Sequence, residues 1–105
     1  MGFEYSCVPT DELTFSIREE LKESILANTE WVQVKTADFP TDTLYLRFVT
    51  SPIREDWLED VVVTISKKEI YVVFYSGHGN KEHHFLSAVQ DFLLVRSVTC
   101  QFYEL

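Results

Sequence analysis

One stretch, residues 60–75, constrains the fold of this chain more than any other. It begins with Asp-Val-Val-Val-Thr-Ile-Ser, breaks at Lys67–Glu69, and continues as Ile-Tyr-Val-Val-Phe-Tyr. Two runs of β-branched and aromatic residues on either side of a short polar break are typical of an antiparallel hairpin. The second run is apolar on both faces, which indicates a central strand covered on at least one side by helix.

A first covering helix is expected over Leu13–Ala27, where an apolar residue recurs at every fourth position. Two start signals compete. Residues 10–11 could provide an early cap, whereas Ser16 and Glu19 form a capping box. We expect a helix that is regular from about Ser16 and ends at Asn28 in a left-handed conformation.

A second covering helix is expected over Lys81–Val95, with Asn80 as its cap. Two of the three glycines fall just before it, in Ser76–Asn80, where the backbone most needs unusual angles. Its apolar stripe consists of Phe85, Leu86, Val89, Phe92 and Leu93.

Four further segments are expected to be strands: Gly2–Val8, Glu30–Thr36, Thr43–Val49 and Val98–Tyr103. The order β-α-β-β-β-β-α-β predicts an α+β fold. It is a two-layer sandwich in which a mostly antiparallel sheet of about six strands carries both helices on one face. At 105 residues, with no linker or repeat, the chain is expected to form one domain, 1–105. The uncovered sheet face would present Gln33, Lys35, Tyr45, Arg47, Tyr71 and Tyr75, with Val32 and Val34 facing inward.

The net charge of −8 is concentrated in residues 1–60. Residues 1–30 carry seven acids against two bases, whereas residues 61–105 carry four of each sign. Contacts to phosphates need clustered Lys and Arg, so we expect neither nucleic acid nor anionic membranes as partners. An acidic surface would steer a basic protein toward it. The same acids also favour solubility, and composition alone does not separate these roles.

The densest acidic cluster surrounds a tryptophan in the longest connection, residues 50–59, where one turn of helix is expected. A tryptophan anchor ringed by acids has the composition of a binding hot spot for a basic partner. The candidate partner-binding residues are Glu55, Asp56, Trp57, Glu59 and Asp60, with Asp38 and Asp42 nearby if the loops lie together. In the alternative interpretation, Trp57 folds back under the sheet edge and the acids are only solvated.

No metal or cofactor is expected. The acidic cluster lacks the glycine turn and alternating carboxylates of a calcium loop. His83 and His84 are adjacent, so they leave a helix about 100° apart and do not easily face one ion. The two cysteines, Cys7 and Cys100, match no metal-binding spacing. We favour two buried thiols in a reducing compartment, with a disulfide between the terminal strands as the alternative.

The segment Ile70–Gly79 ends in Ser-Gly-His-Gly and resembles the catalytic-histidine strand of caspase-like cysteine peptidases. The resemblance covers about ten residues and implies His78 as the base and Cys100 as the nucleophile. In that family the cysteine is followed by a Ser-Gly or similar motif, whereas here it stands in Val-Thr-Cys-Gln-Phe. A peptidase fragment is therefore the third hypothesis, and no enzymatic activity is expected.

The first hypothesis is a non-enzymatic, acidic protein-binding domain that occludes a basic partner. In its compact size, charge asymmetry and lack of catalytic groups, the chain is similar to the immunity proteins that neutralise bacterial nuclease-type toxins. The second hypothesis is a self-associating structural or regulatory module, possessing either a tyrosine-bearing sheet face or an edge strand, Val98–Tyr103, that pairs with a second copy. The sequence also lacks a secretory signal and any apolar run of bilayer length, which predicts a cytoplasmic protein.

Overall fold

The computed structural model of this chain describes residues 2–35, 42–50, 59–75 and 79–105. Within these residues six strands and two helices follow one another in the predicted order, which confirms the α+β class. Their bounds are β1 Gly2–Cys7, α1 Phe15–Ala27, β2 Trp31–Lys35, β3 Thr43–Phe48, β4 Val61–Ile65, β5 Ile70–Tyr75, α2 Asn80–Val95 and β6 Tyr103–Glu104. The helical turn expected in the connection after β3 falls on residues 51–58, outside the described residues.

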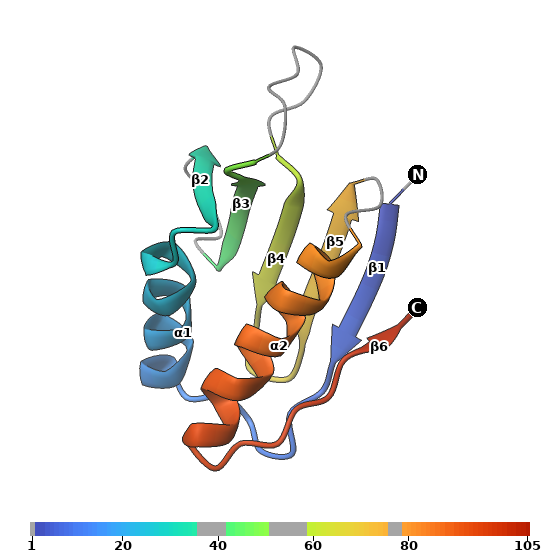
Figure 1. Ribbon diagram of the computed structural model, residues 1–105. Helices are drawn as coiled ribbons and strands as arrows, with labels where there is room; N and C mark the ends of the chain where they lie inside the picture. The colour runs from blue at the N-terminus through green and yellow to red at the C-terminus, as the bar shows by residue number, and fades with distance from the viewer. Residues whose placement is uncertain (1, 36–41, 51–58, 76–78) are drawn as a thin grey trace.

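All six strands form one antiparallel sheet in the order β2-β3-β4-β5-β1-β6. The hairpin predicted from residues 60–75 lies at its centre, with Val63 opposite Val72. Figure 1 shows both helices on the same face of this sheet. The two layers follow from the sequence, because the two helices and the sheet each have one apolar face to bury.

The core lies between the helices and the sheet. Its centre consists of alternate residues of β4 and β5, which are fully buried: Val61, Val63, Ile65, Ile70, Val72 and Phe74. The Phe74 ring meets Phe85 of α2 edge-on, with 5.9 Å between the ring centroids. Phe85 in turn meets Trp31 of β2 at 5.0 Å. Each such aromatic pair contributes about 0.5–1.5 kcal/mol beyond burial, so α2 is held across the sheet by aromatic contacts.

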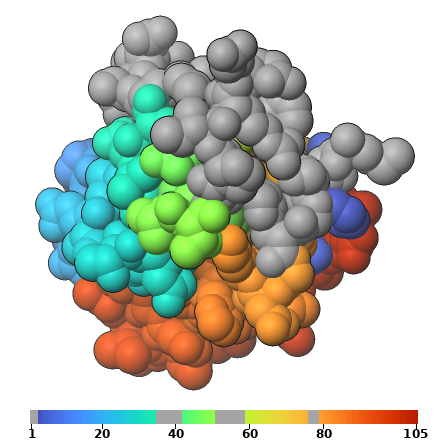
Figure 2. Space-filling model, turned by 45° about the horizontal axis from the view of Figure 1, so that its top comes forward, coloured from blue at the N-terminus to red at the C-terminus, as the bar shows by residue number. Residues whose placement is uncertain are grey.

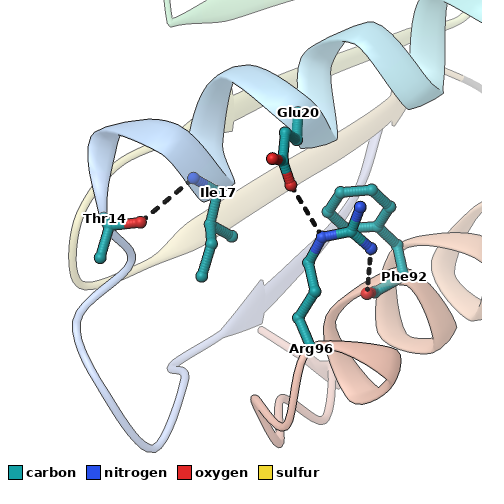
Figure 3. Close-up of polar contacts among 5 residues, drawn as sticks. All are labelled: Thr14, Ile17, Glu20, Phe92 and Arg96. Carbon is teal, nitrogen blue, oxygen red and sulfur yellow. Dashed lines mark hydrogen bonds and ion pairs between the residues drawn. The ribbon is translucent and has the colours of Figure 1, made fainter.

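The helix α1 begins at Phe15, within one residue of the expected start, but its capping residue is neither of the two predicted. Its cap is Thr14, whose hydroxyl oxygen accepts a hydrogen bond from the Ile17 backbone N–H at 3.1 Å (Figure 3). The preceding residue is fixed in the core, because Leu13 is buried and its N–H donates to the Lys67 carbonyl at 2.8 Å. That anchor makes Thr14 the first hydroxyl able to reach the free N–H groups, so the capping box at Ser16 is not used.

Both asparagines at the helix ends differ from their predicted roles. Asn28 does end α1, but at φ −73° and ψ 138° it is extended rather than left-handed. Its side-chain oxygen accepts from the Glu30 N–H at 2.8 Å, a local turn that competes with the left-handed stop. Asn80 is the first residue of α2, and the residue before it, Gly79, takes the positive φ of 59°. The predicted apolar stripe of α2 is confirmed, with its residues buried or half-buried against the sheet.

Over residues 31–33, the strand β2 has the opposite phase to the one predicted, and a bulge between Gln33 and Lys35 then shifts the register so that Lys35 pairs with Tyr45. Trp31 is buried opposite Phe48, whereas Val32 is opposite Arg47 and 40% exposed. Directly paired residues share a face, so Val32 lies on the uncovered face and Gln33, opposite Leu46, does not. Valine occurs on both faces of a strand, and here the larger tryptophan, through its contacts to α2, decides which face is buried.

The C-terminal segment is less regular than predicted, because only Tyr103–Glu104 of the expected strand 98–103 pairs as a strand, with β1. Val98 and Cys100 are nevertheless buried. Cys100 forms a disulfide with Cys7 at the end of β1, with 5.8 Å between their Cα atoms. The favoured expectation of two free thiols is therefore wrong, because the sheet brings together segments that are 93 residues apart.

Candidate functional site

Four of the seven predicted partner-binding residues lie outside the described residues: Asp38, Glu55, Asp56 and Trp57. The structure describes the other three, Asp42, Glu59 and Asp60, and gives them three different environments. Each of these three residues occupies a different position relative to the sheet.

Asp60 is part of the sheet and is only 8% exposed. Its carboxylate accepts a hydrogen bond from the Phe48 N–H at 2.9 Å, and its own N–H donates to the Leu46 carbonyl at 2.7 Å. Its carbonyl also accepts from the Tyr75 N–H at 2.9 Å. Asp60 therefore joins β3, β4 and β5 at the end of the sheet where β4 begins.

Asp42 lies at the other end of β4. Its carbonyl accepts from the N–H of Ile65, the last residue of that strand, at 3.0 Å. A strand of this length spans about 17 Å, so Asp42 and Asp60 lie at opposite ends of β4. The loops whose proximity was the condition for grouping Asp42 with the cluster, residues 36–41 and 51–58, lie outside the described residues.

Glu59, which is half-exposed, has a neighbour at its end of the sheet that the sequence analysis did not include. The Glu30 carbonyl accepts from the Val49 N–H at 3.0 Å, which places the exposed Glu30 where β3 ends. Thr50 follows there, and its hydroxyl is within 2.5 Å of the Lys81 ammonium of α2. Figure 2 views this end of the molecule, where the end of β3 and the start of α2 lie next to each other. We call Glu30 and Glu59 the acidic end of the sheet.

A buried carboxylate lies at the start of α2. Glu82 is 8% exposed, and the Tyr5 hydroxyl donates to it at 3.3 Å. Burial, and next the negative charges of Glu82 and Glu104, raise the pKa of the Tyr5 phenol. On the face of the sheet away from the helices, the Tyr71 hydroxyl donates a hydrogen bond to Glu4 at 2.7 Å. This hydrogen bond is the main cause of the raised pKa of Tyr71. Both phenols thus stay neutral and act as hydrogen-bond donors.

The peptidase hypothesis needs His78 and Cys100 together, but His78 is outside the described residues. The nearest described residues on either side of it, Tyr75 and Gly79, lie at the end of β5 and just before α2. Cys100 follows the far end of α2, a helix about 24 Å long, and is bonded to Cys7 beside the start of β5. A nucleophile must be within hydrogen-bond reach of its base. The positions of Tyr75, Gly79 and Cys100 therefore give the peptidase hypothesis no support.

A shallow cleft of about 240 Å³ lies between α2 and the C-terminal segment, with Gln90, Asp91, Leu94, Thr99, Cys100 and Gln101 as its lining. Over the described ranges, no group of three or more His, Cys, Asp or Glu side chains is arranged to hold a metal ion. No helix in the described part of the chain is long and apolar enough to cross a membrane.

Comparisons of the chain with protein-family models, curated proteins and solved structures find no match.

Proposed function

We propose that this protein is a non-enzymatic binding domain that recognises a basic protein partner at the acidic end of its sheet. The proposal includes an inhibitor-type role, in which the domain occludes a functional surface of that partner. The observation that carries it is the position of Glu30 and Glu59, which come from different segments and flank the same end of the sheet.

The charge distribution supports this proposal. Glu55, Asp56 and Trp57 lie between Thr50 and Glu59 in the sequence. Both Thr50, after β3, and Glu59, before β4, lie at the acidic end of the sheet. Acids gathered in one region raise the association rate of a basic protein through long-range attraction. A tryptophan within such a region would supply the apolar anchor that interfaces need at their centre.

The test compares two variants of equal charge. The site variant carries Glu30→Lys and Glu59→Lys, and the control carries Asp11→Lys and Asp91→Lys, two exposed acids away from the acidic end. Partners are first captured on the immobilised wild-type protein from a lysate of its native host at low salt. The association rate of the captured basic protein is then measured with all three proteins.

We expect the site variant to associate at least about tenfold more slowly at low salt, with the difference shrinking as salt is raised. The control should change the rate far less. Equal losses in both variants would mean that only net charge matters, and the proposed site would be wrong. Capture of only acidic proteins would contradict the proposed partner class.

A further inference from the structure

We propose that the disulfide between Cys7 and Cys100 is a redox switch for the C-terminal segment, residues 99–105. A dithiol that enters the cleft beside α2 reduces the bond at Cys100, and the segment is then released from the edge of β1. This goes beyond the binding function proposed above, because the acidic end of the sheet takes no part in it.

The C-terminal segment is held by few contacts other than the disulfide. Figure 1 shows it running from the end of α2 to the outer side of β1. Only Tyr103 and Glu104 pair as a strand, and Tyr103 and Leu105 are 52% and 62% exposed. Segments with few buried apolar contacts open at a low free energy. The covalent bond is therefore the main restraint on this segment.

The segment has a defined starting point, immediately after Val98. The Val98 N–H donates to the Leu93 carbonyl at 2.9 Å, and its side chain is buried, so Val98 belongs to the end of α2. Within the segment, Cys100 is in the core and Phe102 packs against it, whereas the other core residues come from outside it. The sheet and both helices can thus keep their packing when the segment leaves.

The two cysteines differ in their access to solvent. Cys7 is fully buried, whereas Cys100 lines the cleft of about 240 Å³ between α2 and the C-terminal segment. The side chains of Gln90 and Gln101 also line this cleft. Because access decides which sulfur a thiolate attacks, we expect the attack at Cys100.

The reduction proceeds in two exchange steps. A thiolate of the dithiol attacks the Cys100 Sγ, the bond between the two cysteine sulfurs breaks, and its electron pair leaves with Cys7 as a thiolate. The second thiolate of the dithiol then attacks the mixed disulfide, which releases the Cys100 thiolate and closes the reductant into a disulfide. Two electrons pass from the dithiol to the protein, and the two protons that the dithiol loses neutralise the cysteine thiolates.

Release of the segment would change the edge of the sheet. The Thr99 carbonyl now accepts from the Thr10 N–H at 3.0 Å, and the Leu105 N–H donates to the Glu4 carbonyl at 2.9 Å. Loss of the segment breaks these bonds and makes β1 the edge strand, because β6 is its outer neighbour. The reduced protein would therefore present unpaired backbone groups that the oxidised protein covers.

The test compares amide hydrogen exchange in the oxidised and the dithiol-reduced protein. The reporters are the N–H groups of Thr10 and Phe102, which donate to Thr99 and to the Gln90 side chain. The references are the N–H groups of β4 and β5. A general loss of stability accelerates exchange equally at reporters and references, whereas release adds a further increase at the reporters alone.

We expect reduction to accelerate exchange at the reporters at least about tenfold more than at the references. The double variant Cys7→Ala, Cys100→Ala should show the same difference without a dithiol. Equal acceleration at reporters and references would overturn the proposal, because the bond would then only stabilise the whole fold. Reporters that are already unprotected in the oxidised protein would overturn it as well.

A pair of neighbouring substitutions tests the route of the reductant. Leu94→Trp places a larger side chain in the lining of the cleft, whereas Val95 is also exposed but does not line it. The appearance of thiols is followed in excess dithiothreitol. We expect Leu94→Trp to slow reduction at least about fivefold and Val95→Trp to leave the rate unchanged, because exchange depends on access to the sulfur. Equal rates for the wild type and both variants would contradict attack through the cleft.

Discussion

Asp60 and Glu59 are neighbours in the sequence, but their side chains have different environments. The Asp60 carboxylate is buried and accepts from the Phe48 N–H, whereas Glu59 is half-exposed. We therefore expect Asp60→Ala to lower the free energy of unfolding by about 2–3 kcal/mol, because it leaves a buried donor without its charged acceptor. Glu59→Ala should change it by less than about 0.5 kcal/mol, as for most surface substitutions.

Urea denaturation of the two variants measures this difference. Asp60→Asn is the milder control, because its amide oxygen can still accept from Phe48, and it should fall between the wild type and Asp60→Ala. Equal stability of Asp60→Ala and Glu59→Ala would contradict the structural role of Asp60. The result also decides which of these two neighbouring acids can be replaced in a binding experiment without disturbing the sheet.

At the scale of elements, a polar contact joins the two helices, and Figure 3 shows it. Arg96, after the end of α2, donates to Glu20 of α1 at 2.9 Å and to the Phe92 carbonyl at 3.2 Å. Its guanidinium also lies 3.6 Å from the centroid of the Phe92 ring. The ion pair is partly exposed and contributes little, so most of the effect of Arg96→Ala comes from the ring contact. We expect a loss of about 1 kcal/mol, measured by urea denaturation.

A second ion pair serves as the control for Arg96. Lys68 and Glu12 are 3.9 Å apart and mostly exposed, and neither belongs to a helix or strand. Lys68→Ala should leave the stability almost unchanged. If the two substitutions cost the same, the contact between α1 and α2 would have no special role.

Elements with strong periodicity could be predicted from the sequence, and those decided by distant contacts could not. The α2 stripe follows from local spacing, because only one face of that helix is apolar. The central hairpin follows from two β-branched and aromatic runs on either side of a short polar break. The phase of β2 could not be predicted, since it depends on Trp31 meeting Phe85 from another element. Glu30 was missed as a site residue for the same reason, because only the pairing of β2 and β3 places it at the acidic end.

The whole molecule is closed by the disulfide between Cys7 and Cys100, which ties β1 to the C-terminal segment. Further contacts hold the same segment. The Phe102 N–H donates to the Gln90 side chain at 2.9 Å, and the Leu105 N–H donates to the Glu4 carbonyl at 2.9 Å. These bonds cover part of the edge of β1, which limits pairing with another chain at that edge. The bulge between Gln33 and Lys35 of β2 has the same effect at the opposite edge.

The disulfide closes a loop of 93 residues, so its main effect should be on the unfolded chain. We expect reduction to lower the free energy of unfolding by about 2–5 kcal/mol, because a longer closed loop restricts the unfolded state more. Urea denaturation with and without a dithiol measures the loss. The double variant Cys7→Ala, Cys100→Ala should not respond to the dithiol. Two reactive thiols in the unreduced, urea-unfolded protein would contradict the bond. Thiol trapping in intact cells tests the predicted cytoplasmic location as well, since that compartment keeps most thiols reduced.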